Sequence, residues 1–139
     1  MPITAKRVVQ RYLDAFAGGD METVRGSFAA DATWQIFGEL AHLPPGGVWT
    51  GRDRIVDDFL GHWGPLLFER GTVAMEVVSI LAEGNTVAVE WRVSARTALG
   101  APYSNAYCGI FEVRDEKIQA IREYLDSGYA QKTLFPAEG

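Results

Sequence analysis

The sequence predicts an α+β fold in which N-terminal helices pack on the concave face of a bent sheet of antiparallel or mixed strands. Two observations favour this fold. Helical segments fill the first half of the chain, and four strand-like runs with short turns fill the second half. A chain of 139 residues with 47% hydrophobic and 22% charged residues fits one globular domain over residues 1–139.

The first elements are two short helices and a strand. Apolar residues recur at three- and four-residue spacing over 8–16, which predicts an amphipathic helix. Gly18-Gly19 ends that helix, and Asp20 can cap a second one over 21–28. A strand containing Trp34 is expected next.

A loop and a third helix separate this part from the remaining strands. The loop over 38–51 contains Pro44-Pro45-Gly46-Gly47, and the helix over 54–63 is expected to end at Gly64-Pro65. Alternating runs bounded by turn residues then predict strands over 72–82, 86–95, 103–114 and 117–125. Asp126 is expected to cap the turn into the C-terminal tail.

The charge pattern excludes several classes of partner. The net charge is −5, and Lys and Arg are scattered, so no nucleic-acid partner is expected. No apolar run approaches the length of a membrane span, and residues 1–6 carry no secretory apolar region. We therefore expect a cytoplasmic protein without a membrane partner.

The sequence also predicts no metal and no cofactor. The single cysteine, Cys108, excludes an internal disulfide and a thiolate metal cluster, and its apolar context favours an inert core thiol. The two histidines lie far apart. His42 is expected to be solvated or to gate a pocket, and His62 to lie on the surface or at a helix end rather than act as a general base.

Three stretches carry a resemblance to a known superfamily. They are residues 8–34, which contain Val-Val-Gln-Arg-Tyr, residues 49–59, and residues 105–126, which end in Glu-Tyr-Leu-Asp. With the order of the elements, they resemble the nuclear-transport-factor-2-like superfamily of ketosteroid isomerases, limonene epoxide hydrolases and SnoaL-like polyketide cyclases, and the SnoaL-like branch most. The resemblance implies a cone-shaped fold with an apolar pocket for a small hydrophobic molecule, and a homodimer formed through the convex sheet face, but no single reaction.

Ketosteroid isomerase activity is disfavoured within this superfamily. Tyr12 matches the tyrosine with which those enzymes bind the substrate oxyanion. However, Ile36 and Gly109 stand at the positions of their aspartate base and of their protonated aspartic acid. Abstraction of a proton from carbon requires a base within hydrogen-bond reach, which neither residue supplies.

Limonene epoxide hydrolases provide a second template and the candidate catalytic residues. Glu90, Arg92 and Glu123 match the positions of their Asp-Arg-Asp machinery, with the first acid and the arginine exchanged. One carboxylate would activate water, the arginine would orient both acids, and the second acid would protonate the epoxide oxygen. This hypothesis requires all three side chains to share the concave face. The alternative is a structural network of ion pairs.

Six further residues are candidates to contact the ligand: Tyr12, Trp34, Trp49, Trp63, Asn105 and Tyr107. For the tryptophans the alternative is core packing, and Trp49, beside the Pro/Gly loop, has the strongest claim. Asn105 and Tyr107 are the sparse polar groups that orient a small ligand, or else they pack across strands.

Three functions remain open from the sequence. The favoured one is a cofactor-independent acid-base enzyme of the isomerase, cyclase or epoxide-hydrolase type that acts on a small hydrophobic substrate. The alternatives are a non-catalytic protein that binds a small hydrophobic ligand, and a dimeric interaction module that works through the convex sheet face.

Overall fold

The computed structural model describes residues 3–41 and 43–136, so His42 lies outside the described residues. Its elements in chain order are α1 (Ala5–Ala17), α2 (Met21–Gly26), β1 (Phe28–Ile36), η1 (Pro45–Gly47), β2 (Val48–Thr50), η2 (Arg54–Trp63), α3 (Gly64–Leu67), β3 (Ala74–Glu83), β4 (Thr86–Arg96), β5 (Pro102–Arg114), β6 (Lys117–Leu125) and α4 (Ser127–Leu134).

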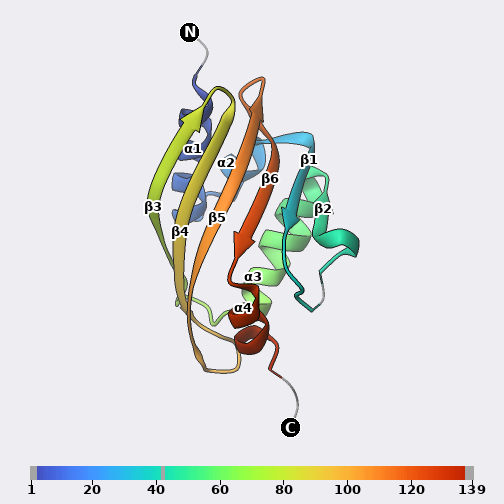
Figure 1. Ribbon diagram of the computed structural model, residues 1–139, viewed down its shortest axis with the longest axis vertical. Coiled ribbons are helices and arrows are strands. Elements are labelled where there is room, and N and C mark those ends of the chain that lie inside the picture. Colours follow the sequence, from blue (N-terminus) through green and yellow to red (C-terminus); the bar gives the residue numbers. More distant parts are fainter. Residues whose placement is uncertain (1–2, 42, 137–139) are drawn as a thin grey trace.

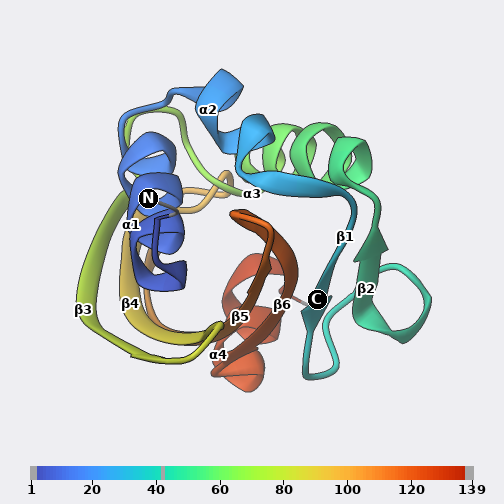
Figure 2. The same ribbon diagram turned by 90° about the horizontal axis from the view of Figure 1, so that it is seen from above.

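One six-stranded sheet in the order β2-β1-β6-β5-β4-β3 organises these elements. The β1–β6 pair is parallel and the other pairs are antiparallel, so the sheet is mixed. Strands β3 to β6 form one face of the molecule, with α1 and α2 behind them (Figure 1). Seen from above, β3 and β4 bend around α1 (Figure 2). The predicted α+β architecture is thus confirmed.

The first two helices form for the reasons that the sequence indicates. Thr4 caps α1 by accepting a hydrogen bond from the Arg7 backbone N–H at 3.2 Å. Asp20 caps α2 by accepting from the Thr23 N–H at 3.1 Å. The apolar stripe of α1 is buried against the sheet and includes Val9 and Tyr12.

Two local features, the third helix and the loop after β1, differ from the sequence prediction, whereas the predicted cap at Asp126 agrees with it. The third helix is a π-helix, η2, and it does not end at Gly64-Pro65 but continues into α3. Pro65 lies in the first turn of α3. The predicted loop contains the short strand β2, which pairs with β1. Asp126 caps α4, because its carboxylate accepts from the Tyr129 N–H at 3.0 Å.

The hydrophobic core lies between the helices and the inner face of the sheet. The Tyr12 ring contacts the rings of Phe16, Phe28 and Phe111 with centroids 6.2, 5.4 and 5.9 Å away. The core therefore contains Tyr12, one of the residues that the sequence suggests as a ligand contact. No helix within the described part of the chain is long and apolar enough to cross a membrane.

Candidate functional site

Glu123 is the central residue of the candidate site. On β6 it pairs with Ile36 of the parallel strand β1 and with Gly109 of β5, so it lies in the middle of the sheet. Its side chain shares the inner face with Trp34, because Trp34 and Ile36 have the same parity along β1. The residue is only 6% exposed.

The surroundings of the Glu123 carboxyl favour its neutral form. Burial raises the pKa of this carboxyl to about 8, and the nearby indole N–H of Trp34 opposes this rise. The Trp34 Nε1 atom is itself buried without a hydrogen bond of regular geometry. No cation is among the groups that shift the Glu123 pKa. The carboxyl therefore titrates close to neutral pH.

Tyr12 brings a second polar group to the same interior. Burial raises the pKa of its hydroxyl, and the charge of Glu123 raises it further, so the two groups lie within electrostatic reach of each other. The residue is 3% exposed. Within the described chain the Tyr12 side chain makes ring contacts and this electrostatic interaction, and its hydroxyl makes no hydrogen bond. The Tyr12 O–H therefore has no hydrogen-bond acceptor among the described residues.

Strand β5 adds a hydrogen-bonded group of three residues on the same face. The hydroxyls of Tyr103 and Tyr107 are hydrogen-bonded to each other. Asn105 Nδ2 donates to the Tyr103 hydroxyl at 3.0 Å and to the Asp126 carbonyl at 3.1 Å. Burial raises the pKa of both phenols, and the charge of Glu123 contributes to both shifts.

Aromatic rings form the walls around these polar groups. Phe59 of η2 stacks on Trp49 at 5.3 Å and meets Trp34 edge-on at 5.0 Å. On the other side Trp91 stacks on Tyr107 with centroids 5.4 Å apart. A Cβ at Gly109 would lie 2.9 Å from Trp91 Cζ3, so the absence of a side chain at Gly109 admits the indole ring.

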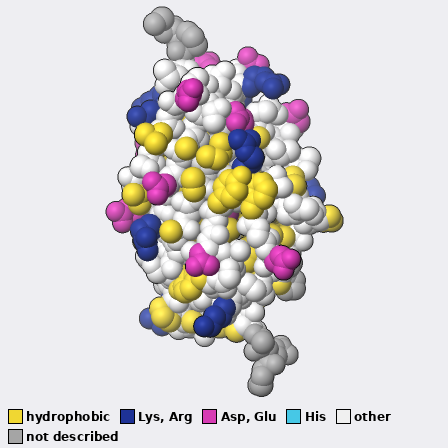
Figure 3. All heavy atoms as spheres, in the orientation of Figure 1, with side chains coloured by type: hydrophobic (Ala, Val, Ile, Leu, Met, Phe, Trp, Pro, Cys, Tyr) yellow, Lys and Arg dark blue, Asp and Glu magenta, His cyan; other side chains and the backbone are white. Residues whose placement is uncertain are grey.

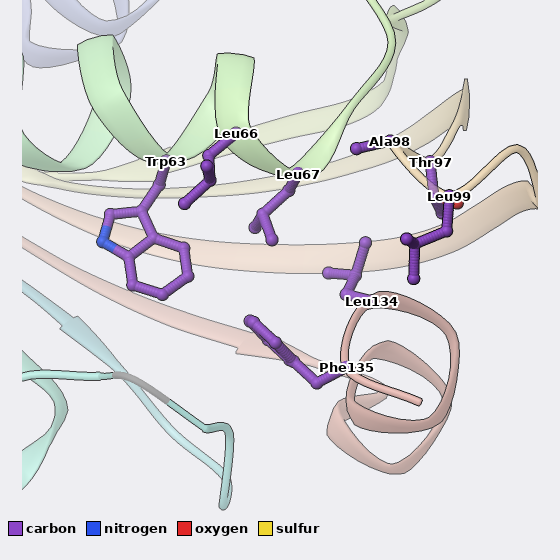
Figure 4. Close-up of a pocket in the computed structure, with 8 residues that line it drawn as sticks. All are labelled: Trp63, Leu66, Leu67, Thr97, Ala98, Leu99, Leu134 and Phe135. Carbon is purple, nitrogen blue, oxygen red and sulfur yellow. The ribbon is translucent and has the colours of Figure 1, made fainter. Parts of the chain in front are cut away.

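A cavity of about 360 Å³ opens at the end of the molecule where α3, the β4–β5 connection and α4 meet (Figure 4). It is lined by Trp63, Leu66, Leu67, Thr97, Ala98, Leu99, Leu134 and Phe135. The Trp63 and Phe135 rings meet edge-on at 5.9 Å. Trp63 thus lines this apolar cavity, which is called the groove at the open end of the fold below.

The predicted convergence of Glu90, Arg92 and Glu123 is wrong. Glu90 pairs with Cys108, and the adjacent residue of β5, Gly109, pairs with Glu123. Neighbouring residues of a strand point to opposite faces, so Glu90 and Arg92 lie on the outer face. Both are exposed, and Glu90 accepts a hydrogen bond from Ser79 Oγ at 2.8 Å.

The other candidate residues lie either in the interior or on the surface. Tyr12, Trp34, Trp49, Asn105 and Tyr107 all lie in the interior, and their contact with a ligand stays a prediction. His62 is exposed near the end of η2.

Cys108 is half-buried on the outer face, not in the core, because it pairs with Glu90. Partial burial and the charge of Glu90 raise the pKa of its thiol, which still indicates an unreactive group.

Sequence reasoning left out Tyr103 and Phe59 as site residues. Tyr103 shares its strand and parity with Asn105 and Tyr107, so the signal was present. Phe59 gave no such signal, since only the packing of η2 shows that its ring lies between two tryptophans.

Comparisons with known proteins agree with this architecture. The family model of the SnoaL-like domain matches residues 9–121. An NTF2-like protein from Burkholderia thailandensis E264 superposes with a TM-score of 0.82 at 18% identity, covering 97% of this chain and 100% of that chain. Bal32a from a soil-derived mobile gene cassette gives 0.81 at 24% identity, covering 94% and 95%.

A third similar structure is that of TerC co-crystallized with polyporic acid. It has a TM-score of 0.79 and 18% identity, and the alignment covers 94% of this chain and 97% of TerC. A search of curated proteins found no match. The family match spans most of the sequence, and the fold agrees with it over nearly the whole chain. The chain therefore belongs to the SnoaL-like domain family, and its fold is that of the NTF2-like protein structures.

Proposed function

We propose that the protein is a cofactor-independent acid-base enzyme of the isomerase or cyclase type, with Glu123 as the proton-transferring residue. The observation that carries this proposal is the Glu123 carboxyl, which is buried on the inner face beside the Trp34 indole and whose pKa burial raises to about 8. A general acid or base is most efficient when its pKa lies near the working pH. The family supports binding of small molecules and reactions of this type.

The reaction that suits this arrangement is proton transfer at a carbon next to a carbonyl group. The ionised Glu123 carboxylate removes the proton, and the C–H electron pair moves into the enolate. The protonated carboxyl then returns the proton to another atom of the same substrate. With a pKa of about 8, roughly a tenth of the Glu123 side chains are ionised at neutral pH, so both forms are available.

Epoxide hydrolysis receives less support from the same geometry. That reaction needs one group to activate water and a second acid to protonate the leaving oxygen. Glu90 and Arg92 lie across the sheet from Glu123 and are exposed, so the predicted partner groups are outside the interior.

The proposal is tested by hydrogen exchange, which needs no knowledge of the product. Small ketones and polyporic acid, the latter included because of the TerC structure, are incubated with the protein in D₂O. We expect exchange of carbon-bound protons with the wild type and none above background with Glu123→Gln. The matched control is Glu90→Gln, which changes a carboxyl on the outer face and should exchange like the wild type.

A non-catalytic binding protein is the second candidate function. The groove at the open end is apolar and includes Trp63, Leu66 and Leu99, so it suits the hydrophobic part of a ligand. Binding of a panel member without any exchange would favour this candidate. Equal exchange by Glu123→Gln and wild type would contradict the enzymatic proposal.

We also infer that two copies associate through the outer face of the sheet. Hydrophobic side chains gather across the middle of this face, with charged groups around them (Figure 3). The register places Leu81, Ala88, Ile110, Cys108 and Tyr124 on it. Leu81 is 71% exposed and Tyr124 is 44% exposed. The face also carries both Glu90 and Arg92, and opposite charges on one surface suit a two-fold contact with a second copy.

Sedimentation measures this association directly. We expect the wild type to sediment as a dimer and Leu81→Arg as a monomer. Leu99→Arg is the matched control, because Leu99 is 73% exposed but lies in the groove at the open end. A monomeric wild type, or a dimer that persists in Leu81→Arg, would contradict the inference.

A further inference from the structure

Trp34 is the side chain of β1 that lies beside Glu123 on the inner face. The parallel register pairs Trp34 with Ile121 and Ile36 with Glu123, so Trp34 and Glu123 are diagonal neighbours on adjacent strands. Side chains two residues apart on a strand point to the same face. Trp34 and Glu123 are almost completely buried, at 4% and 6% exposed. An indole ring and a carboxyl therefore share one interior space.

The indole N–H of Trp34 is a buried donor without a regular hydrogen bond. Among the described residues neither Trp34 Nε1 nor Trp49 Nε1 has a partner at hydrogen-bond geometry. The two tryptophans pair in register across β1 and β2, but only β1 is next to β6, which carries Glu123. Buried donors are normally satisfied, which makes a donor placed beside an ionisable group informative.

Aromatic contacts fix the orientation of the Trp34 ring. Phe59 meets it edge-on at 5.0 Å, with an angle of 81° between the ring planes, and the Phe28 ring lies 6.3 Å away. Phe59 in turn stacks on Trp49 at 5.3 Å. Edge-to-face and stacked pairs are favourable beyond the burial of their area, so a rotation of the indole would break several such contacts.

The helix that supplies Phe59 has a rare geometry. η2 is a π-helix ten residues long, whereas π-helices mostly occur as single-turn bulges and are frequent at functional sites. An α-helix has fewer residues per turn, so an α-helical register would rotate Phe59 relative to the fully buried Ile55. The π-helical register is therefore part of what places Phe59 against Trp34.

We propose that Trp34 is a positioning residue for Glu123, oriented by Phe59, and that its indole N–H donates to the carboxylate when Glu123 ionises. This inference rests on the proposed proton transfer by Glu123 and assigns the residue that controls it. Hydrogen bonds to a carboxylate are shorter and stronger than those to a neutral group, so the contact tightens on ionisation. One carboxylate oxygen then accepts from the indole, and the other is left to take the substrate proton.

The groups around Glu123 agree with a role for a neutral donor. Hydrogen bonding from Trp34 lowers the pKa of the carboxyl against the larger rise caused by burial. The titratable groups that interact with the Glu123 charge are phenols, Tyr12 on α1 and Tyr103 and Tyr107 on β5. Burial raises the pKa of each phenol above its ordinary value of 10.0, so of these groups only Glu123 changes its charge near pH 8.

NMR of the wild type labelled with nitrogen-15 at its tryptophans tests the contact without any substrate. The indole N–H signals are assigned with variants in which each Trp is replaced by Phe. We expect the Trp34 proton signal to move downfield as the pH rises, with a midpoint at about 8, and the Trp49 signal to stay constant. Glu123→Gln should abolish this movement. Glu90→Gln, the matched control on the outer face, should preserve it.

Replacement of Trp34 by Phe tests the consequence for Glu123. The loss of one hydrogen bond to a charged group should raise the midpoint of the Glu123 carboxyl, followed by carbon-13 NMR, by about 1–2 pH units. The pH dependence of proton exchange should move upward with it. Trp49→Phe is the matched control, because it removes the other buried indole N–H and should leave the midpoint unchanged. Phe59→Leu keeps the Trp34 N–H but removes the ring that orients it, so it should raise the midpoint by less.

A Trp34 signal that stays constant in the wild type, or that still moves in Glu123→Gln, would overturn the inference. An unchanged Glu123 midpoint in folded Trp34→Phe would overturn it as well. If Trp34→Phe does not fold, the wild-type titration decides. If the Trp34 signal follows Glu123 but no substrate exchanges protons, the inference stands and the enzymatic proposal fails. If exchange depends on Glu123 while the Trp34 signal stays constant, only the inference fails.

Discussion

The two faces of the sheet hold two glutamates in opposite environments. Glu90 and Glu123 pair with Cys108 and Gly109, which are adjacent residues of β5. Glu90 is exposed and accepts a hydrogen bond from the Ser79 hydroxyl. Glu123 is 6% exposed, and burial raises the pKa of its carboxyl to about 8. Their partners on β5 are adjacent and point to opposite faces, so Glu90 is a solvated surface residue and Glu123 is a candidate catalytic acid in the interior.

The outer face balances its charges and the inner face does not. On the outer face Arg122 forms an ion pair with Glu112 at 2.9 Å. On the inner face Glu123 has no cationic neighbour among the groups that shift its pKa, and the Tyr12 hydroxyl makes no hydrogen bond to a described residue. Unmet polar groups in an interior cost stability, so their retention favours a functional reason for them.

Replacement of Glu123 by Gln should produce the largest change in stability. The carboxyl pKa is raised to about 8 in the folded state, so the folded protein binds the proton more tightly than the unfolded chain. The favourable contribution is complete below the unfolded value of 4.5 and is lost as the pH rises through 8. Across this pH range we expect the unfolding free energy of Glu123→Gln to rise relative to that of the wild type by on the order of 4 kcal/mol.

Denaturant unfolding at several pH values measures this change in unfolding free energy. The cost of burying the Gln amide is the same at every pH, so the variation with pH isolates the contribution of the carboxyl. Glu90→Gln is the control, with an expected change within about 0.5 kcal/mol at every pH, as for other exposed substitutions. A Glu123→Gln difference that does not vary with pH would show that the carboxyl is not held neutral by the fold.

Gly109→Ala tests how tightly the inner face is packed, with a smaller expected effect. The new Cβ would lie 2.9 Å from Trp91 Cζ3 and 3.0 Å from Phe111 Cε1. We expect a loss of about 1–3 kcal/mol of unfolding free energy from this overpacking. The neighbouring outer-face change Cys108→Ala should cost about 0.5 kcal/mol or less.

A double variant assigns the cause of that loss. Combining Gly109→Ala with Trp91→Phe should cost less than the sum of the single changes, because the smaller ring leaves room for the methyl group. Strictly additive losses would mean that the indole is not what Gly109 accommodates.

The sequence predicted the fold well but the site only in part. Periodicity located the first helix and the four long strands, and parity grouped Tyr103, Asn105 and Tyr107 on one face, because both depend on local spacing. Which parity of β4 faces inward depends on its register with β5, which no local pattern in Glu90-Trp91-Arg92 encodes. The resemblance to epoxide hydrolases therefore gave Glu123 correctly as an inner-face residue but placed Glu90 and Arg92 on the wrong side.

Glu112→Gln should have the smallest effect and the opposite pH dependence. The hydrogen bond from Arg122 lowers the pKa of the Glu112 carboxyl, so its contribution is present above the unfolded value of 4.5 and is lost as the pH falls below it. Both side chains are 37% exposed, so solvent screening limits the loss in the variant to about 0.5–1 kcal/mol near neutral pH. The same unfolding series should show this loss vanish in acid, where the pH-dependent gain of Glu123→Gln is absent as well. A loss that persists in acid would mean that Glu112 stabilises the sheet by packing, and the contrast between a charged outer face and a neutral inner face would then rest on Glu123 alone.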